Sequence, residues 1–86
     1  MSKNVWKRSD ISQQTVLSVY ARPFEQRYPV DEMIARETGA PIKVVWAAMM
    51  REDSKGHLDY GTNLRGGWLT EKGVDRLNEI QGGLRR

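Results

Sequence analysis

The sequence of 86 residues contains no cysteine, a single histidine and no long apolar run. Without cysteine the chain cannot form a disulfide, a thiolate metal site or a cysteine nucleophile, and one isolated histidine (His57) argues against zinc. No stretch approaches the roughly 20 apolar residues that a membrane span needs, and the first eight residues lack the apolar core of a signal peptide. We therefore expect a cytoplasmic protein that has no metal, no cofactor and no membrane contact.

A catalytic constellation is also lacking. The paired acids Asp31-Glu32 and Glu52-Asp53 cannot act together, because adjacent residues on a helix point in different directions. The stretch 61–66 begins and ends with glycine, but the Lys-Ser/Thr of a phosphate-binding loop does not follow it. No nucleophile, base and orienting group can be assembled, so we expect a non-enzymatic protein with no catalytic residue.

Positive charge is in modest excess and does not form a strongly basic stripe. The formal net charge is +3, with five bases and two acids in residues 1–28 and a nearly balanced remainder. The length and the 38% of apolar residues fit one small globular domain covering residues 1–86. Residues 1–9 are expected to form a flexible basic arm and residues 82–86 a frayed tail, either of which could bind phosphates without sequence preference.

Helical periodicity predicts four helices, and local signals mark where the first two begin and end. Asp10 with Gln13 resembles a capping box that begins the first helix. Pro23 should end it, because the residue before a proline avoids the helical region. The second helix should begin at Pro29, with the acids at 31 and 32 near the positive end of its dipole, and end at Gly39 in the left-handed conformation.

The third helix is predicted from Pro41 to about Asp53. At 100° per residue its core face comprises four apolar residues: Ile42, Val45, Ala48 and Met49. Five others flank or oppose that face: Lys43, Trp46, Ala47, Met50 and Arg51. Trp46 lies at the edge of the core face, so it either closes the core or belongs to a functional surface.

A hairpin and a last helix are predicted after a break at 54–56. Residues 57–60 alternate in polarity as a half-buried strand does, 61–66 are rich in turn residues, and 67–69 form a short returning strand. Trp68 on that strand is expected to face the helices. Thr70 should cap the last helix, whose apolar stripe is Val74, Leu77 and Ile80.

The order of helix, helix, tight turn, helix, hairpin and helix is typical of a helix-turn-helix followed by a wing. The stretch Met33–Pro41 resembles the "IA..TG.." core of helix-turn-helix domains. The stretch Gly67–Gly73 is similar to the "W-x-L-T-x-x-G" return strand and helix start of bacterial and archaeal winged-helix repressors. The resemblance spans about residues 12–80 and implies an α+β winged-helix fold.

This resemblance implies a duplex-DNA-binding protein of bacterial or phage type, serving transcription regulation or a related DNA transaction. The helix 41–53 would enter the major groove and the loop 61–66 would act as the wing. The implied DNA contacts are Lys43, Trp46, Ala47, Met50 and Arg51 on the helix, Arg65 and Asn63 on the wing, and Lys55 at the base of the hairpin. Because one such module binds DNA weakly, a homodimer is expected, with Trp6 or the last helix at its interface.

Two departures from the family pattern keep another function open. Glu52 stands where the pattern usually has an apolar residue. The presumed reading face also has few of the Arg, Lys, Asn and Gln side chains that read base edges. The alternative is a protein–protein interaction module that docks on a partner through Trp46 and Met50, since such a pair is more typical of a protein contact.

Overall fold

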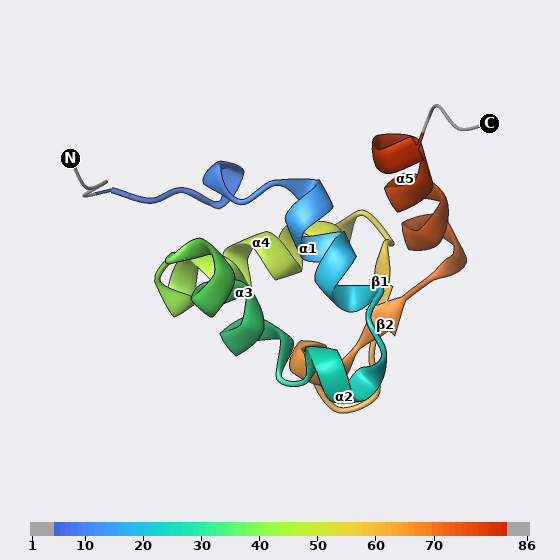
Figure 1. Cartoon of the computed structure of the whole chain (residues 1–86), viewed down its shortest axis with the longest axis horizontal. Coiled ribbons are helices and arrows are strands. Elements are labelled where there is room, and N and C mark those ends of the chain that lie inside the picture. The colour runs from blue at the N-terminus through green and yellow to red at the C-terminus, as the bar shows by residue number, and fades with distance from the viewer. Residues whose placement is uncertain (1–4, 83–86) are drawn as a thin grey trace.

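The computed structural model describes residues 5–82. Within that range the chain forms an α+β fold of five helices and one two-stranded antiparallel sheet (Figure 1). The elements in chain order are η1 (Arg8–Asp10), α1 (Gln13–Tyr20), α2 (Phe24–Arg27), α3 (Val30–Thr38), α4 (Ile42–Ser54), β1 (Leu58–Asp59), η2 (Leu64–Gly66), β2 (Trp68–Leu69) and α5 (Glu71–Gly82). This order agrees with the predicted α+β class and is compatible with a winged-helix layout.

The start of α1 differs from the prediction. Its N-cap is Ser12, whose hydroxyl accepts a hydrogen bond from the backbone N–H of Thr15 at 3.0 Å. Asp10 instead belongs to the short 3-10 helix η1, where its carboxylate accepts from the backbone N–H of Lys7 at 2.9 Å. The predicted cap at Asp10 is therefore wrong, because Ser12 competes for the same role two residues later. The helix ends at Ala21, just before the residue that precedes proline.

The α3–turn–α4 unit forms where the sequence predicts it. Pro29 precedes the first residue of α3, and Gly39 ends the helix with a φ of 81°, a left-handed conformation that glycine adopts without steric cost. The hydroxyl of Thr38 accepts a hydrogen bond from the backbone N–H of Ala40 at 3.1 Å and so tightens the turn. Pro41 is then the N-cap of α4.

The core lies where α1 meets α3, α4 and α5. Its buried members are Ile11, Val16, Leu17, Val19, Tyr20, Val30, Ile34, Ala40, Val45, Ala48, Met49, Leu58, Leu64 and Leu77. The predicted core face of α4 is confirmed for all but one residue, since Ile42 is 45% exposed. Ile42 belongs to the first turn of α4, which lies at the edge of the molecule (Figure 1).

The hairpin is shorter than predicted, with two residues in each strand. Leu58 pairs with Leu69, and Asp59 pairs with Trp68. Cross-strand partners share one face of a sheet, so the indole of Trp68 lies on the solvent side with Asp59 and is 44% exposed. The expectation that Trp68 faces the helices is therefore wrong, and the leucine pair makes the inward contact.

The segment between the strands is folded back onto the domain. Within it η2 contacts α3, and Leu64 is buried. The phenol of Tyr20 donates a hydrogen bond to the carbonyl oxygen of Leu64 at 2.6 Å. The segment between the strands is thus attached to α1 and α3.

The last helix begins at the predicted cap. The hydroxyl of Thr70 accepts from the N–H of Gly73 at 3.0 Å and donates to the carbonyl oxygen of Gly56 at 2.7 Å. A Cβ at Gly73 would lie 2.1 Å from the carbonyl oxygen of His57, so glycine allows α5 to approach the hairpin. Leu77 is buried as predicted, whereas Val74 is 43% exposed, because α5 contacts α1 and β2 along a narrow stripe.

The two predicted chain ends lie partly outside the described residues. Residues 1–4 of the expected arm and 83–86 of the expected tail belong to the ranges that the structure does not describe. In the described part of the arm, Trp6 packs against the core cluster and η1 contacts α4. The described part of the arm therefore runs beside α4.

Candidate functional site

The outward side of α4 carries three of the predicted contact residues at the surface. Lys43 is exposed, Met50 is 57% exposed and Ala47 is half-buried. Ile42, which the sequence placed in the core, joins them as an exposed apolar side chain. We call these four residues, Ile42, Lys43, Ala47 and Met50, the α4 surface.

Trp46 is held away from that surface by a hydrogen bond. Its indole N–H donates to Oδ2 of Asp31 at 3.0 Å, and its half-buried ring packs against the core cluster. Of the two alternatives open for Trp46, the structure favours the one in which it closes the edge of the core. Its ring does not project from α4 as a side chain free for a partner.

The side chain of Arg65 on η2 is bound to α3. Its guanidinium donates to both carboxylate oxygens of Asp31, with Nε–Oδ1 at 3.2 Å and NH2–Oδ2 at 3.0 Å, and lies 3.4 Å from Glu32. Arg65, which the resemblance implied to be a DNA contact, is thus engaged within the protein, because the fold places these two acids within reach of η2. Asn63 has a local role, since its side chain accepts from the backbone N–H of Arg65 at 3.0 Å and caps η2.

Asp31 is the centre of this group, which we call the Asp31 cluster: Asp31, Glu32, Trp46 and Arg65. Its side chain is 3% exposed. Burial by itself raises the pKa of Asp31, but the hydrogen bonds from Arg65 and Trp46, together with the positive charge of Arg65, outweigh burial and hold that pKa below its ordinary value. From the sequence, Asp31 was explained by its place near the positive end of the helix dipole. Its hydrogen-bond partners from distant parts of the chain were not predicted.

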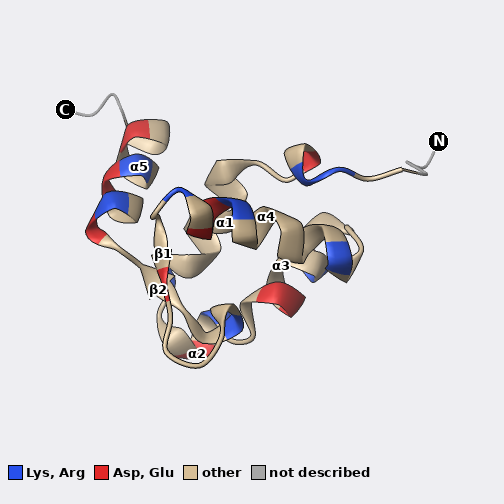
Figure 2. Ribbon diagram, turned by 180° about the vertical axis from the view of Figure 1, so that it is seen from behind, with Lys and Arg blue, Asp and Glu red and all other residues tan. Residues whose placement is uncertain are grey.

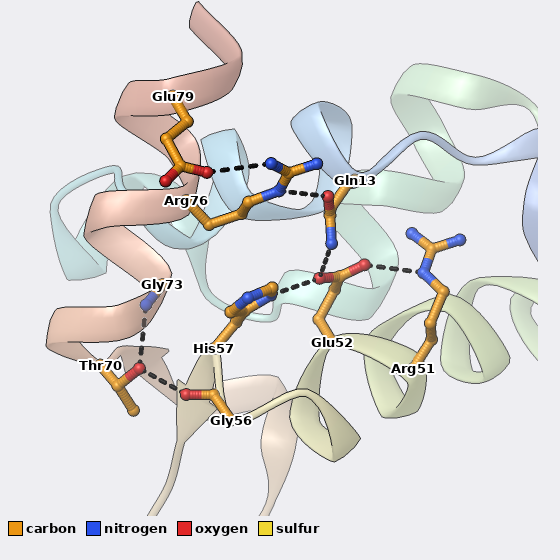
Figure 3. Close-up of polar contacts among 9 residues, drawn as sticks. All are labelled: Gln13, Arg51, Glu52, Gly56, His57, Thr70, Gly73, Arg76 and Glu79. Atoms are coloured by element: carbon orange, nitrogen blue, oxygen red, sulfur yellow. Dashed lines mark hydrogen bonds and ion pairs between the residues drawn. The ribbon is translucent and has the colours of Figure 1, made fainter. Parts of the chain in front are cut away.

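A second buried carboxylate lies near the C-terminal end of α4. Glu52 is fully buried, and Oε1 hydrogen-bonds with Nδ1 of His57 at 2.8 Å and with Nε2 of Gln13 at 2.9 Å (Figure 3). Its Oε2 accepts from Nε of Arg51 at 2.7 Å. We call Gln13, Arg51, Glu52 and His57 the Glu52 cluster. The one signal for it in the sequence is a charged residue on the apolar side of a helix.

These bonds place Arg51 inside the structure. Its side chain is 16% exposed, and besides Glu52 it donates from NH1 to the backbone carbonyl oxygen of Arg8 at 2.9 Å. Arg51 therefore fastens the N-terminal segment to α4 and does not project into solvent as a base-reading residue would. Gln13 extends the cluster to α5 by accepting from Nε of Arg76 at 2.8 Å (Figure 3).

The hydrogen bonds hold Glu52 ionised. Burial raises its pKa, but the bonds from His57, Gln13 and Arg51 and the charge of Arg51 act more strongly in the other direction, so the pKa lies below its ordinary value. Gln13, Arg51 and His57 each bond to Glu52, while NH2 of Arg51 is buried without a hydrogen-bond partner among the described residues. The cluster therefore holds α4 to the segments around it.

Most of the unpaired exposed bases lie along α4 and the segment beside it. Among residues 5–82, six exposed bases form no ion pair: Lys7, Arg8, Lys43 and Lys55 on or beside α4, Arg36 on α3 and Lys72 on α5. Figure 2 shows basic positions on the N-terminal segment, which contacts α4 through η1. These side chains have no described structural partner and are available to a ligand.

Neither a metal site nor a membrane-spanning helix is found in residues 5–82. No group of three or more His, Cys, Asp or Glu side chains in residues 5–82 is placed to hold a metal ion. None of the helices described here has the length and apolar character needed to cross a membrane. No family model, curated protein or solved structure matches this chain.

Proposed function

We propose that the protein binds duplex DNA without catalysis, with α4 as the helix that enters the major groove. The observation that carries the proposal is the set of unpaired bases on and around the second helix of a helix-turn-helix unit. Lys43 lies at the start of α4, Lys55 at its end, and Arg8 is tied to its last turns through Arg51. The winged-helix resemblance of the sequence supports the same arrangement.

The spacing of these bases suits a groove. Lys43 and Lys55 are separated by 12 residues, which at 1.5 Å per residue places them about 18 Å apart along the helix axis. The major groove is about 12 Å wide. A helix lying in it would bring the two lysines near phosphates on its opposite sides, and the N-terminal segment would add Lys7 and Arg8 on one side.

Base reading then rests on few residues. Arg51, Trp46 and Arg65 are engaged within the protein, which leaves Lys43 as the hydrogen-bonding side chain of the α4 surface. Ala47 and Met50 can contact thymine methyl groups. We expect phosphate contacts to dominate affinity, so log K should fall against log salt with a slope of about −3 to −4 for four contacts.

The test is a titration of a labelled mixed-sequence duplex by fluorescence anisotropy at low and moderate salt. Lys43→Ala should weaken binding several-fold and reduce the salt slope by about 1. Lys72→Ala is the matched control, because it removes the same charge from α5, across the molecule from the α3–α4 turn (Figure 1). Absence of duplex binding at low salt, or equal losses in the two variants, would contradict the proposal.

A second function is favoured by the apolar part of the same surface. Ile42 and Met50 are 45% and 57% exposed, and methionine adapts readily to a protein partner. The expected partner of this kind is a second copy of the chain, which would also strengthen weak DNA binding. Light scattering across a concentration series should show a dimer that Met50→Asp disrupts and that Tyr60→Asp, at another exposed position outside α4 and α5, leaves intact. A strict monomer that still binds duplex DNA tightly would rule out the dimer.

A further inference from the structure

Three exposed aromatic rings line one cleft on another part of the surface. The cleft has a volume of about 480 Å³ and is bounded by Phe24 and Tyr28, by loop residues 61–63 with Gly66, and by Trp68. Its walls are α2 and the segment between β1 and β2. In Figure 1 these elements lie at the bottom of the molecule, away from the N-terminal segment.

The exposure of these rings indicates an interaction site. Phe24, Tyr28 and Trp68 are 53%, 45% and 44% exposed, in a chain with only seven aromatic residues. Phe24 and Tyr28 stack with their centroids 5.3 Å apart, and both line the same cleft as Trp68. Large apolar rings gathered at a concave surface are typical of an interaction site.

Two exposed carboxylates adjoin residues of the cleft, although the chain is basic overall. Asp59 is the cross-strand partner of Trp68, so its exposed carboxylate lies beside the indole. Glu25 follows Phe24 on α2 and is also exposed. Figure 2 shows acidic positions on both α2 and the sheet.

The neighbouring cations are already engaged. Arg27 donates from Nε to the carbonyl oxygen of Gly67 at 3.1 Å and from NH1 to that of Arg22, with its guanidinium 5.5 Å from the centre of the Phe24 ring. Arg65 is bound to Asp31. An anionic ligand such as a nucleic acid would therefore find exposed carboxylates and no unengaged cation here, whereas a peptide with positive charge would be attracted.

We propose that this cleft binds an extended, proline-rich peptide segment of a partner protein that carries a lysine or arginine beside the prolines. A polyproline II segment has a solvated backbone without internal hydrogen bonds and is already ordered, so it binds to aromatic grooves at low entropic cost. The proline rings would lie between Trp68 and the Phe24–Tyr28 stack. The basic side chain would pair with Asp59 or Glu25. This proposal is independent of DNA binding, because it uses none of the residues of the α4 surface.

The test uses a labelled oligoproline peptide that ends in arginines. Binding is followed by anisotropy and by the NMR signal of the Trp68 indole N–H. Trp68→Ala should weaken binding at least tenfold, and Asp59→Asn should weaken it several-fold for the arginine-bearing peptide only. Tyr60→Ala is the matched control, because Tyr60 is an aromatic residue that is 40% exposed and does not line the cleft.

Three results would overturn the proposal. One is a peptide that does not bind, and another is binding that is equal in wild type and in folded Trp68→Ala. The third is a single-stranded oligonucleotide that shifts the Trp68 signal when the peptide does not, which would assign the rings to nucleobases. Circular dichroism of each variant verifies folding, and Phe24→Ala repeats the test on the opposite wall if Trp68→Ala unfolds.

Discussion

The Asp31 and Glu52 clusters hold opposite ends of the same helix with the same chemistry but with different access to water. Both centre on a buried carboxylate that accepts from an arginine and from an aromatic N–H or ring nitrogen. In the Glu52 cluster Arg51 and His57 are 16% and 7% exposed, whereas Arg65 in the Asp31 cluster is 35% exposed. This difference indicates that the stability lost when a carboxylate is removed depends on whether its hydrogen-bond partners can turn to solvent.

Removal of the Glu52 carboxylate should have the largest effect. Glu52→Ala leaves Arg51 as a charge with little access to water and leaves Gln13 and His57 without an acceptor, so the free energy of unfolding should fall by about 3–5 kcal/mol. Urea denaturation followed by circular dichroism measures this. Glu79→Ala is the control, since Glu79 is 66% exposed and among residues 5–82 pairs with Arg76 alone, and it should change stability by less than about 0.5 kcal/mol. Equal losses in the two variants would refute the structural role of the Glu52 cluster.

Removal of the Asp31 carboxylate should cost less. Asp31→Ala leaves the indole N–H of Trp46 without its acceptor, which costs about 1–3 kcal/mol, while Arg65 can reach water. Urea denaturation of the two alanine variants compares the clusters directly. Glu32→Ala removes a 55% exposed acid from the same arginine and should change stability little. If Asp31→Ala lowers the free energy of unfolding as much as Glu52→Ala does, the expected difference between the two clusters is contradicted.

Acid should produce the smallest difference between the clusters. Both carboxyl groups have a pKa below the ordinary values of 3.8 for Asp31 and 4.5 for Glu52. A lowered pKa in the folded state stabilises the protein above the ordinary value, and this stabilisation is lost as the pH falls through the folded pKa. Thermal unfolding against pH should therefore show a decline that starts near 4.5 and is shallower in Glu52→Gln. Asp31→Asn should flatten only the part of the decline at lower pH, and an unchanged profile in both variants would contradict the assignment.

Much of the fold was predictable because its signals are local. Gly39 ends α3, Pro41 precedes α4 and Thr70 caps α5, each through contacts within a few residues along the chain. The start of α1 was missed because Ser12 and Asp10 are both good caps, and their sequence context does not rank them. The exposure of Trp68 was missed because it depends on the register with Asp59.

The site was less predictable than the fold. Lys43, Ala47 and Met50 lie on the outward side of α4 as the helical periodicity predicts. Arg51 and Arg65 are engaged by carboxylates, and Trp46 by Asp31, through contacts that no periodicity encodes. The aromatic cleft was not foreseen either, since Phe24 and Trp68 are 44 positions apart in the sequence.

The sequence by itself determined the α+β order of elements, the turn between α3 and α4 and the net positive charge, because caps, prolines, glycines and apolar spacing act over a few residues. Only the tertiary structure decided which charges remain free. An arginine is equally able to bind a phosphate or a buried carboxylate, and the choice depends on whether an acid distant in sequence is brought within about 3 Å. For Arg51 and Arg65 the fold supplies that acid, whereas for Lys43 no acid among the described residues is within ion-pair distance.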